Sequence, residues 1–212
     1  FPVSGSKDTP LFIFIHGGYW RMLSKNESSF MAPNLVGHGV AVAAINYTLA
    51  PPADIDQIVA ECRRAIQWLY QNATSYGIDP DRIYVGGSSA GGHLTGMMVA
   101  GGWQEEYGLS GDIIKGGLPM SGLFDLEPIV KCFVNEWMHM SMADGIRNSP
   151  AQNLPAKGCP LVVAVGADET GEFRRQSKDF SELWTSQGWS SDYLECRGIH
   201  HFNAPLELCN PS

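Results

Sequence analysis

Short apolar runs alternate along this chain with segments that have helical periodicity. The runs are rich in aliphatic and β-branched residues, and they predict strands at 11–15, 40–45, 82–86, 114–120, 161–165 and 192–196. Strands that alternate with helices in this way form βαβ units around a mostly parallel sheet. The sequence therefore predicts an α/β fold with helices flanking the sheet.

The segment 54–76 has the clearest helical pattern. Its apolar residues recur at three- and four-residue steps, as on a helix that packs one face on a core; they are Ile55, Ile58, Val59, Cys62, Ala65, Ile66 and Leu69. Asp54 or Asp56 is the candidate for its N-cap. Further helices are predicted at 89–100 and 172–187.

The segment 122–160 breaks the alternation. It contains several turn residues and a short Met-rich amphipathic stretch at 133–142. We expect a small cap over the sheet, with a long connection as the alternative. No repeat or linker divides the chain, so residues 1–212 are expected to form one domain.

Composition favours a small molecule as the partner. The chain is 44% hydrophobic and 17% charged, which is typical of a globular protein, and it has no apolar stretch of about 20 residues that could span a bilayer. Its net charge of −8 and the absence of a Lys/Arg cluster argue against nucleic acid and anionic membranes. The oligomeric state stays open, a homodimer included.

The five cysteines predict neither a disulfide framework nor a zinc site, because they are scattered, odd in number and free of CxxC spacing. No charged and apolar leader opens the chain, so a cytoplasmic setting is expected. The first residue is Phe1, and we expect the natural N-terminus to be truncated.

A candidate nucleophile follows the predicted strand 82–86. Residues 87–91, GSSAG, fit G-x-S-x-G with Ser89 at the centre. A serine at a strand-to-helix corner lies on a strained turn that requires small neighbours, and the following helix N-terminus favours negative charge. Ser89 is therefore the expected nucleophile, and Ser88, off the centre of the motif, is the weaker candidate.

A serine hydroxyl needs a histidine to remove its proton and an acid to orient that histidine. Two later loops offer these groups: Asp168 and Glu169 follow the strand 161–165, and His200 and His201 follow the last strand. Neighbours in a loop point in different directions, so one member of each pair can serve. No third ligand stands at a recognisable spacing from the histidines, and no metal site is predicted.

The motifs HGGYW, GSSAGG, the acidic loop and HHF, in this order, resemble the α/β-hydrolase superfamily. More narrowly, the chain is similar to the kynurenine formamidase (arylformamidase) branch and related bacterial esterases, whose signature is HGGxW. The segment YTLAP at 47–51 is similar to a segment of hormone-sensitive-lipase-like enzymes. The resemblance covers nearly the whole chain, although the family usually has more residues before HGGxW.

The resemblance implies that Ser89 is the nucleophile and that backbone N–H groups form an oxyanion hole. These N–H groups come from Gly17, Gly18, Tyr19 and Ala90. Glycines at such a turn let N–H groups face the nucleophile with no Cβ in the way. His16 is then expected to support the turn, and His93 to be a packing residue.

The resemblance also selects one member of each pair. The superfamily acid usually stands three residues after the glycine that ends its strand, which favours Glu169 over Asp168. EFRRQ at 172–176 resembles a run of this branch. The branch places its histidine immediately before Phe, which favours His201 over His200.

The resemblance implies a serine hydrolase that needs no cofactor and cleaves a small ester or amide through an acyl-enzyme. An arylformamidase of the N-formylkynurenine type is expected first. A short-chain carboxylesterase is the alternative, and a non-catalytic binding protein on the same fold is a more distant one. Tyr19, Trp20 and Phe124 are expected to line an apolar substrate pocket, together with Phe133 and Trp137 from the cap.

Overall fold

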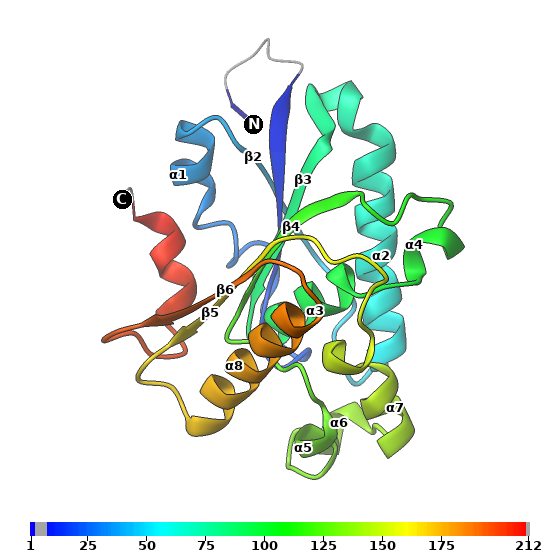
Figure 1. The fold of residues 1–212 in the computed structure, drawn as a ribbon, viewed down its shortest axis with the longest axis vertical. Coiled ribbons are helices and arrows are strands. Elements are labelled where there is room, and N and C mark those ends of the chain that lie inside the picture. Colours follow the sequence, from blue (N-terminus) through cyan, green and yellow to red (C-terminus); the bar gives the residue numbers. More distant parts are fainter. Residues whose placement is uncertain (3–7, 211–212) are drawn as a thin grey trace.

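The computed structural model describes residues 1–2 and 8–210 (Figure 1). Its strands form one sheet in the order β2-β1-β3-β4-β5-β6, and every neighbouring pair is parallel. The strands are β1 (Thr9–Ile15), β2 (Ala41–Ile45), β3 (Ile78–Ser88), β4 (Ile114–Met120), β5 (Leu161–Gly166) and β6 (Ser191–Cys196). The predicted α/β fold with a parallel sheet is confirmed. β3 begins earlier than predicted, because Ile78 already pairs with Thr9 of β1.

Strand β1 is buried on both faces, which explains its uninterrupted apolar sequence. Side chains alternate across a strand. Leu11, Ile13 and Ile15 therefore enter one core, whereas Phe12 and Phe14 enter a second core on the opposite face. The sheet thus separates two apolar layers.

Helices cover both layers. The larger core is closed by α2 (Ile55–Asn72), α3 (Ala90–Val99) and α8 (Gly171–Ser186), whose buried residues belong to it. The smaller core is covered by α1 (Ala32–Gly37) and the 3₁₀ helix η3 (Ala204–Cys209), which lie side by side in Figure 1. The amide of Asn34 donates to the carbonyl of Leu208 and joins these two helices.

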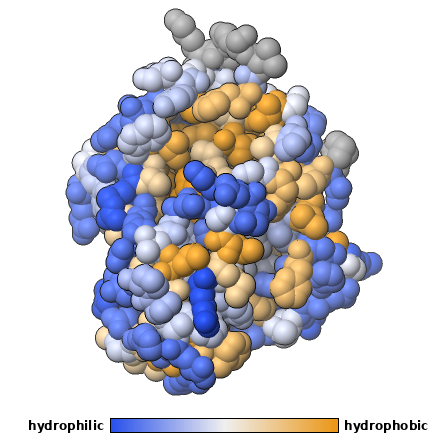
Figure 2. Space-filling view, turned by 180° about the vertical axis from the view of Figure 1, so that it is seen from behind, coloured by the Kyte–Doolittle hydropathy of each residue, from blue (hydrophilic) through white to orange (hydrophobic). Residues whose placement is uncertain are grey.

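Strand β2 forms one edge of the sheet, and its central residues Val42, Ala43 and Ala44 are only half-buried. Seen from behind, the surface carries an apolar area in its upper half, bounded below by a hydrophilic band (Figure 2). Among the described residues, no helix is long and apolar enough to cross a membrane.

The segment between β4 and β5 folds into short helices that gather at the lower end of the molecule in Figure 1. They are α5 (Glu127–Val130), α6 (Asn135–Met138), α7 (Met142–Arg147) and the 3₁₀ turn η2 (Pro150–Gln152). Within the predicted Met-rich stretch, Met138 and Met140 are buried. Outside this segment, the short helices α1 and α4 (Trp103–Glu106) were not predicted.

The N-cap of α2 is Asp54, whose side chain accepts a hydrogen bond from the N–H of Gln57 at 2.8 Å. The alternative, Asp56, instead pairs with Arg147 of α7. The α-helix ends at Asn72, and the rest of the predicted helix is the 3₁₀ turn η1 (Ala73–Tyr76), closed by Gly77 at φ 71°. The sequence pattern thus predicted the start of this helix more accurately than its end.

We expect Asp54→Ala to lower the free energy of unfolding by about 1 kcal/mol, because the N–H of Gln57 loses its acceptor. Urea denaturation of the variant and the parent measures this difference. Asp192→Ala, at an exposed position on β6, is the control and should leave the free energy of unfolding nearly unchanged. Equal losses in the two variants would contradict the capping role.

Candidate active site

Ser89 lies at the corner between β3 and α3 with a strained backbone, φ 60° and ψ −120°. The corner has no room for a side chain two positions before or two positions after Ser89. A Cβ on Gly91 would lie 2.0 Å from the carbonyl oxygen of Ile15, and one on Gly87 would lie 2.5 Å from that of Gly91. The N–H of Ser89 donates to the carbonyl of Met120, which ties the corner to β4. These contacts hold the serine in a conformation that L-residues rarely adopt.

The structure brings Ser89, His201 and Glu169 into one hydrogen-bonded row. The Oγ of Ser89 lies 3.0 Å from Nε2 of His201, and Nδ1 of His201 lies 2.6 Å from Oε2 of Glu169. Because a carboxylate only accepts, this arrangement places the imidazole proton on Nδ1 and leaves Nε2 free to accept from the serine. The row therefore has the geometry that activates a serine hydroxyl.

The other members of the three candidate pairs lie outside this row. Asp168 is exposed, and its N–H donates to the carbonyl of Ile199. His200 is also exposed, and its Nδ1 accepts from the N–H of Phe202. Ser88 is the last residue of β3 and pairs there with Met120 of β4.

Glu169 is buried and holds its position through its second oxygen. Oε1 accepts hydrogen bonds from the hydroxyl of Ser121 and, at 2.8 Å, from the N–H of Gly166. Burial alone would raise the pKa of this carboxyl, but the bonds from His201, Ser121 and Gly166 outweigh it and hold the pKa below its usual value. The carboxylate is therefore ionised at neutral pH.

Sequence reasoning missed Ser121, although it follows the predicted strand 114–120 directly. Its side chain is fully buried, and its backbone is strained at φ 47°. Its N–H donates to the carbonyl of Ala164, which fixes the residue beside β5. A small polar residue at the carboxyl end of a central strand was the signal available for finding it.

The turn 17–20 lies directly against the serine corner, since a Cβ on Gly17 would be 3.2 Å from Cβ of Ser89. Every carbonyl of this turn accepts a hydrogen bond. The Gly17 carbonyl accepts from the side chains of Tyr47 and His16, and the Gly18 carbonyl accepts from the N–H groups of Arg21 and Met22. The Tyr19 carbonyl accepts from Nε1 of Trp137, and the Trp20 carbonyl accepts from the N–H of Ala50.

The N–H groups of Gly18 and Tyr19, in contrast, donate to no other group in the part of the chain that the structure describes. The N–H of Ala90 belongs to the first residue of α3, where a helix supplies no acceptor. Three of the four predicted donors, those at Gly18, Tyr19 and Ala90, thus lie around one corner with their hydrogen-bonding capacity free among the described residues.

Two predicted pocket residues do not line an open pocket. Trp20 is fully buried, and its Nε1 donates to Nδ1 of His93 at 3.3 Å. Phe124 is 1% exposed and stacks on Phe180 with ring centroids 4.2 Å apart. Both aromatic side chains pack in the core, which argues against a role for Trp20 and Phe124 in lining a substrate pocket. Tyr19 is half-buried at the turn and stays a candidate.

His93 connects the turn to the segment between β4 and β5. It lies one helical turn after Ser89, accepts from Trp20 at Nδ1, and faces the carbonyl of Asn148 with Nε2 at 2.7 Å. Both bonds require the neutral ring, and burial lowers the pKa of His93 to about 4. Asn148 in turn donates to Asp56 of α2. The site, α7 and α2 are therefore joined through one buried imidazole.

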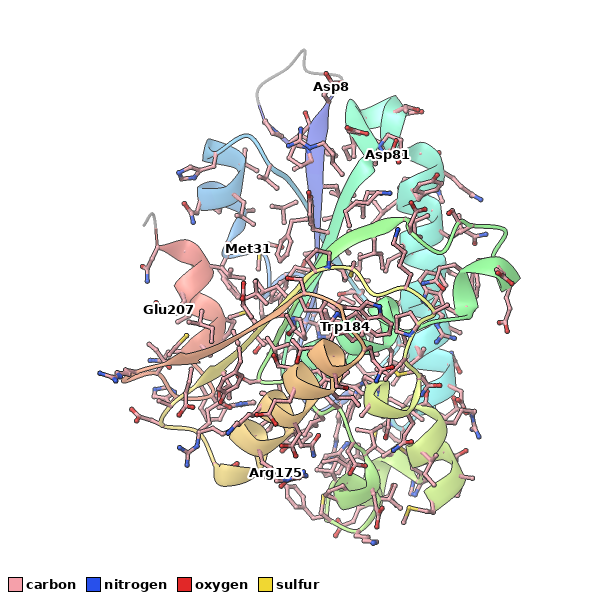
Figure 3. The ribbon with its side chains drawn as sticks, viewed as in Figure 1. Asp8, Met31, Asp81, Arg175, Trp184 and Glu207 are labelled. Atoms are coloured by element: carbon pink, nitrogen blue, oxygen red, sulfur yellow. The ribbon has the colours of Figure 1, made fainter. Side chains whose placement is uncertain are left out.

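A cavity of about 620 Å³ lies away from these residues. Its walls come from the beginning of β4, at Ile114 and Lys115, and from the residues just before β5, at 158–160. Ser89 follows the opposite, carboxyl end of β3. Substrates of parallel α/β sheets bind at the carboxyl ends of strands, so this cavity is not the catalytic pocket. Trp184 of α8, labelled in Figure 3, is buried in the larger core.

His93 makes stability dependent on pH. Its pKa is about 4 in the folded protein and about 6.5 in the unfolded chain, so the unfolded chain binds the proton more readily. The free energy of unfolding is therefore unaffected by protonation of His93 above pH 6.5. It decreases as the pH falls towards 4, by up to about 3 kcal/mol, because the unfolded chain is stabilised by protonation of this histidine. Urea denaturation of the parent and of His93→Gln at pH 7 and pH 4.5 measures this contribution. A pH dependence that is the same in both proteins would contradict it.

Comparisons with known proteins identify relatives of this chain among the hydrolases. The BD-FAE family model matches residues 1–131. Kynurenine formamidase from Salmo salar is 38% identical, and the alignment covers 98% of this chain and 70% of that protein. The kynurenine formamidase from Danio rerio is 36% identical with the same coverage. An esterase from Pyrobaculum calidifontis superimposes with a TM-score of 0.82 at 18% identity, over 98% of this chain and 73% of that one.

The family match covers more than half of the chain, and the two formamidases align over nearly all of it. The esterase shares the fold. The chain therefore belongs to the BD-FAE family of hydrolases in the α/β-hydrolase superfamily, with the kynurenine formamidases among its relatives.

Proposed function

We propose that the protein is an arylformamidase that uses Ser89, His201 and Glu169 to hydrolyse substrates of the N-formylkynurenine type. The observation that carries the proposal is the hydrogen-bonded row from Ser89 through His201 to Glu169, at 3.0 and 2.6 Å, beside unpaired backbone N–H groups. The names of the two relatives at 38% and 36% identity support the formamide as substrate.

In the first half of the reaction, Oγ of Ser89 attacks the formyl carbon and Nε2 of His201 takes the serine proton. The N–H groups of Gly18, Tyr19 and Ala90 stabilise the oxyanion, each by about 3 kcal/mol. His201 then gives the proton to the departing arylamine, which leaves a formyl ester on Ser89.

In the second half, His201 takes a proton from water, and the resulting hydroxide attacks the formyl ester. The C–O bond to Ser89 breaks, His201 returns the proton to Oγ, and formic acid leaves and gives its proton to solvent to become formate. Glu169 stays ionised throughout. It holds the proton-bearing Nδ1 of His201 and stabilises the imidazolium that forms twice in each cycle.

We also propose that the segment 122–160 acts as a cap of a single catalytic domain. Trp137 of α6 donates from Nε1 to the carbonyl of Tyr19 at 3.2 Å, and the guanidinium of Arg21 lies 4.8 Å from the centre of the Trp137 ring. These contacts place an aromatic side chain of the cap beside the turn 17–20, where an aryl leaving group would pack.

A cytoplasmic location is supported by the free cysteines, since none is disulfide-bonded in the described residues.

A carboxylesterase is the second candidate, because the same triad cleaves esters and the fold is shared with an esterase. Turnover of N-formylkynurenine and of p-nitrophenyl acetate separates the two functions. We expect faster turnover of the formamide, and an organophosphate adduct on Ser89 that is absent from Ser89→Ala. Good ester cleavage without formamide cleavage would favour the esterase, and absence of an adduct in folded protein would exclude a serine hydrolase.

The acid assignment has its own test. We expect Glu169→Gln to lower kcat by about a thousandfold or more, because the amide cannot hold the imidazole in the required charge state. Asp168→Asn should leave kcat within about twofold of the parent, since Asp168 is exposed outside the row. Steady-state kinetics on the same acyl substrate measure both variants. The reverse ranking would move the acid to Asp168.

A further inference from the structure

The peptide group between Gly17 and Gly18 must face one way for the oxyanion hole to exist. In a planar trans peptide, the C=O and the N–H point in opposite directions. The carbonyl of Gly17 therefore has to point away from Ser89 if the N–H of Gly18 is to point towards it. If this peptide turned over, a carbonyl oxygen would face the developing negative charge and repel it.

This peptide group has little intrinsic resistance to turning over. It lies between two glycines, which rotate more freely than other residues because they lack a Cβ. Gly18 adopts φ 97°, a conformation in which a Cβ would lie 2.3 Å from the carbonyl oxygen of Met22. The orientation therefore has to be imposed by groups outside the two glycines.

Two side chains hold the Gly17 carbonyl. The hydroxyl of Tyr47 lies 3.2 Å from this oxygen and 3.1 Å from the carbonyl oxygen of His16, and Nδ1 of His16 lies 2.9 Å from the Gly17 oxygen. A carbonyl only accepts, so Nδ1 of His16 bears the proton. The rings of His16 and Tyr47 stack with centroids 4.2 Å apart and an angle of 14° between them.

Burial makes both donors strong holding groups. Tyr47 is 6% exposed and His16 is 1% exposed, so turning the peptide over would leave the buried Nδ1–H of His16 without an acceptor and would reduce the acceptors of the Tyr47 hydroxyl from two to the His16 carbonyl alone. Burial also lowers the pKa of His16 and raises that of Tyr47, which keeps both side chains neutral at pH 7. Tyr47 lies two residues after the end of β2, so the segment after β2 contacts the turn that follows β1.

We propose that Tyr47, assisted by His16, is the positioning residue of the oxyanion hole: the two side chains hold the Gly17 carbonyl away from Ser89 and so direct the N–H of Gly18 towards the reacting carbonyl. Neither side chain contacts the substrate. The inference rests on the proposed nucleophile Ser89 but not on the identity of the acyl substrate.

The test is Tyr47→Phe, which removes the hydroxyl and retains the ring stacked on His16. Two constants are measured on whichever acyl substrate the parent hydrolyses: kcat, and the inhibition constant of an aryl trifluoromethyl ketone. The carbonyl carbon of this ketone bonds to Oγ of Ser89 and leaves an oxyanion in the hole. We expect kcat to fall about tenfold, the ketone to bind weaker by a similar factor, and KM to change less than about twofold.

Tyr70→Phe is the matched control, because Tyr70 is a half-buried tyrosine of α2 away from the turn. Both constants should stay at the parent values in this variant. If Tyr47→Phe retains kcat within about twofold, the proposal is overturned. A fall in kcat with unchanged ketone affinity overturns it as well. A misplaced oxyanion hole has to weaken the binding of an inhibitor whose oxyanion lies in that hole.

If Tyr47→Phe does not fold, His16 provides a second measurement. His16→Asn keeps an N–H donor near the Gly17 carbonyl, whereas His16→Leu removes it. The proposal requires ketone affinity and kcat to fall together in His16→Leu and to be largely retained in His16→Asn. Equal effects of the two substitutions would overturn it. Poor cleavage of formamides by the parent would count against the proposed substrate only, because these ratios can be measured with an ester.

Discussion

The strained corner at Ser89 is the constraint on which the rest of the site depends. Its conformation, φ 60°, is maintained because strands on either side of β3 bond to or press against the corner, and because Gly87 and Gly91 leave no Cβ to clash. Once the serine projects from the end of β3, the neighbouring strands deliver the other groups. β1 leads into the turn 17–20, β5 leads to Glu169, and β6 leads to His201.

The carbonyls of the turn after β1 are hydrogen-bonded by donors from three different parts of the chain, which are Tyr47, Trp137 and backbone N–H groups. The N–H groups of Gly18 and Tyr19 bond to no group that the structure describes, and in the proposed mechanism they bind the reacting oxygen. The same arrangement explains the buried Trp20, whose indole is anchored on His93. Packing, and not pocket formation, accounts for the aromatic character of this residue.

Much of this architecture could be predicted from local pattern. The six strands, the long helices and the position of Ser89 follow from apolar periodicity and from a G-x-S-x-G motif between a strand and a helix. Residues alone left Asp168 and Glu169 equal, since adjacent loop residues differ only in direction. The resemblance to a known family favoured Glu169, which is the residue that the structure places 2.6 Å from His201.

The sequence by itself determined the order of the elements and the supply of reactive groups, because hydrophobic periodicity and glycine spacing are local properties. Only the tertiary structure decided which side chains meet. Ser121 reaches Glu169 from 48 positions away, Tyr47 reaches Gly17 from 30, and Phe124 turns into the core instead of the pocket. These contacts depend on strand order and on the direction of each side chain at a strand end, which no short stretch of sequence encodes.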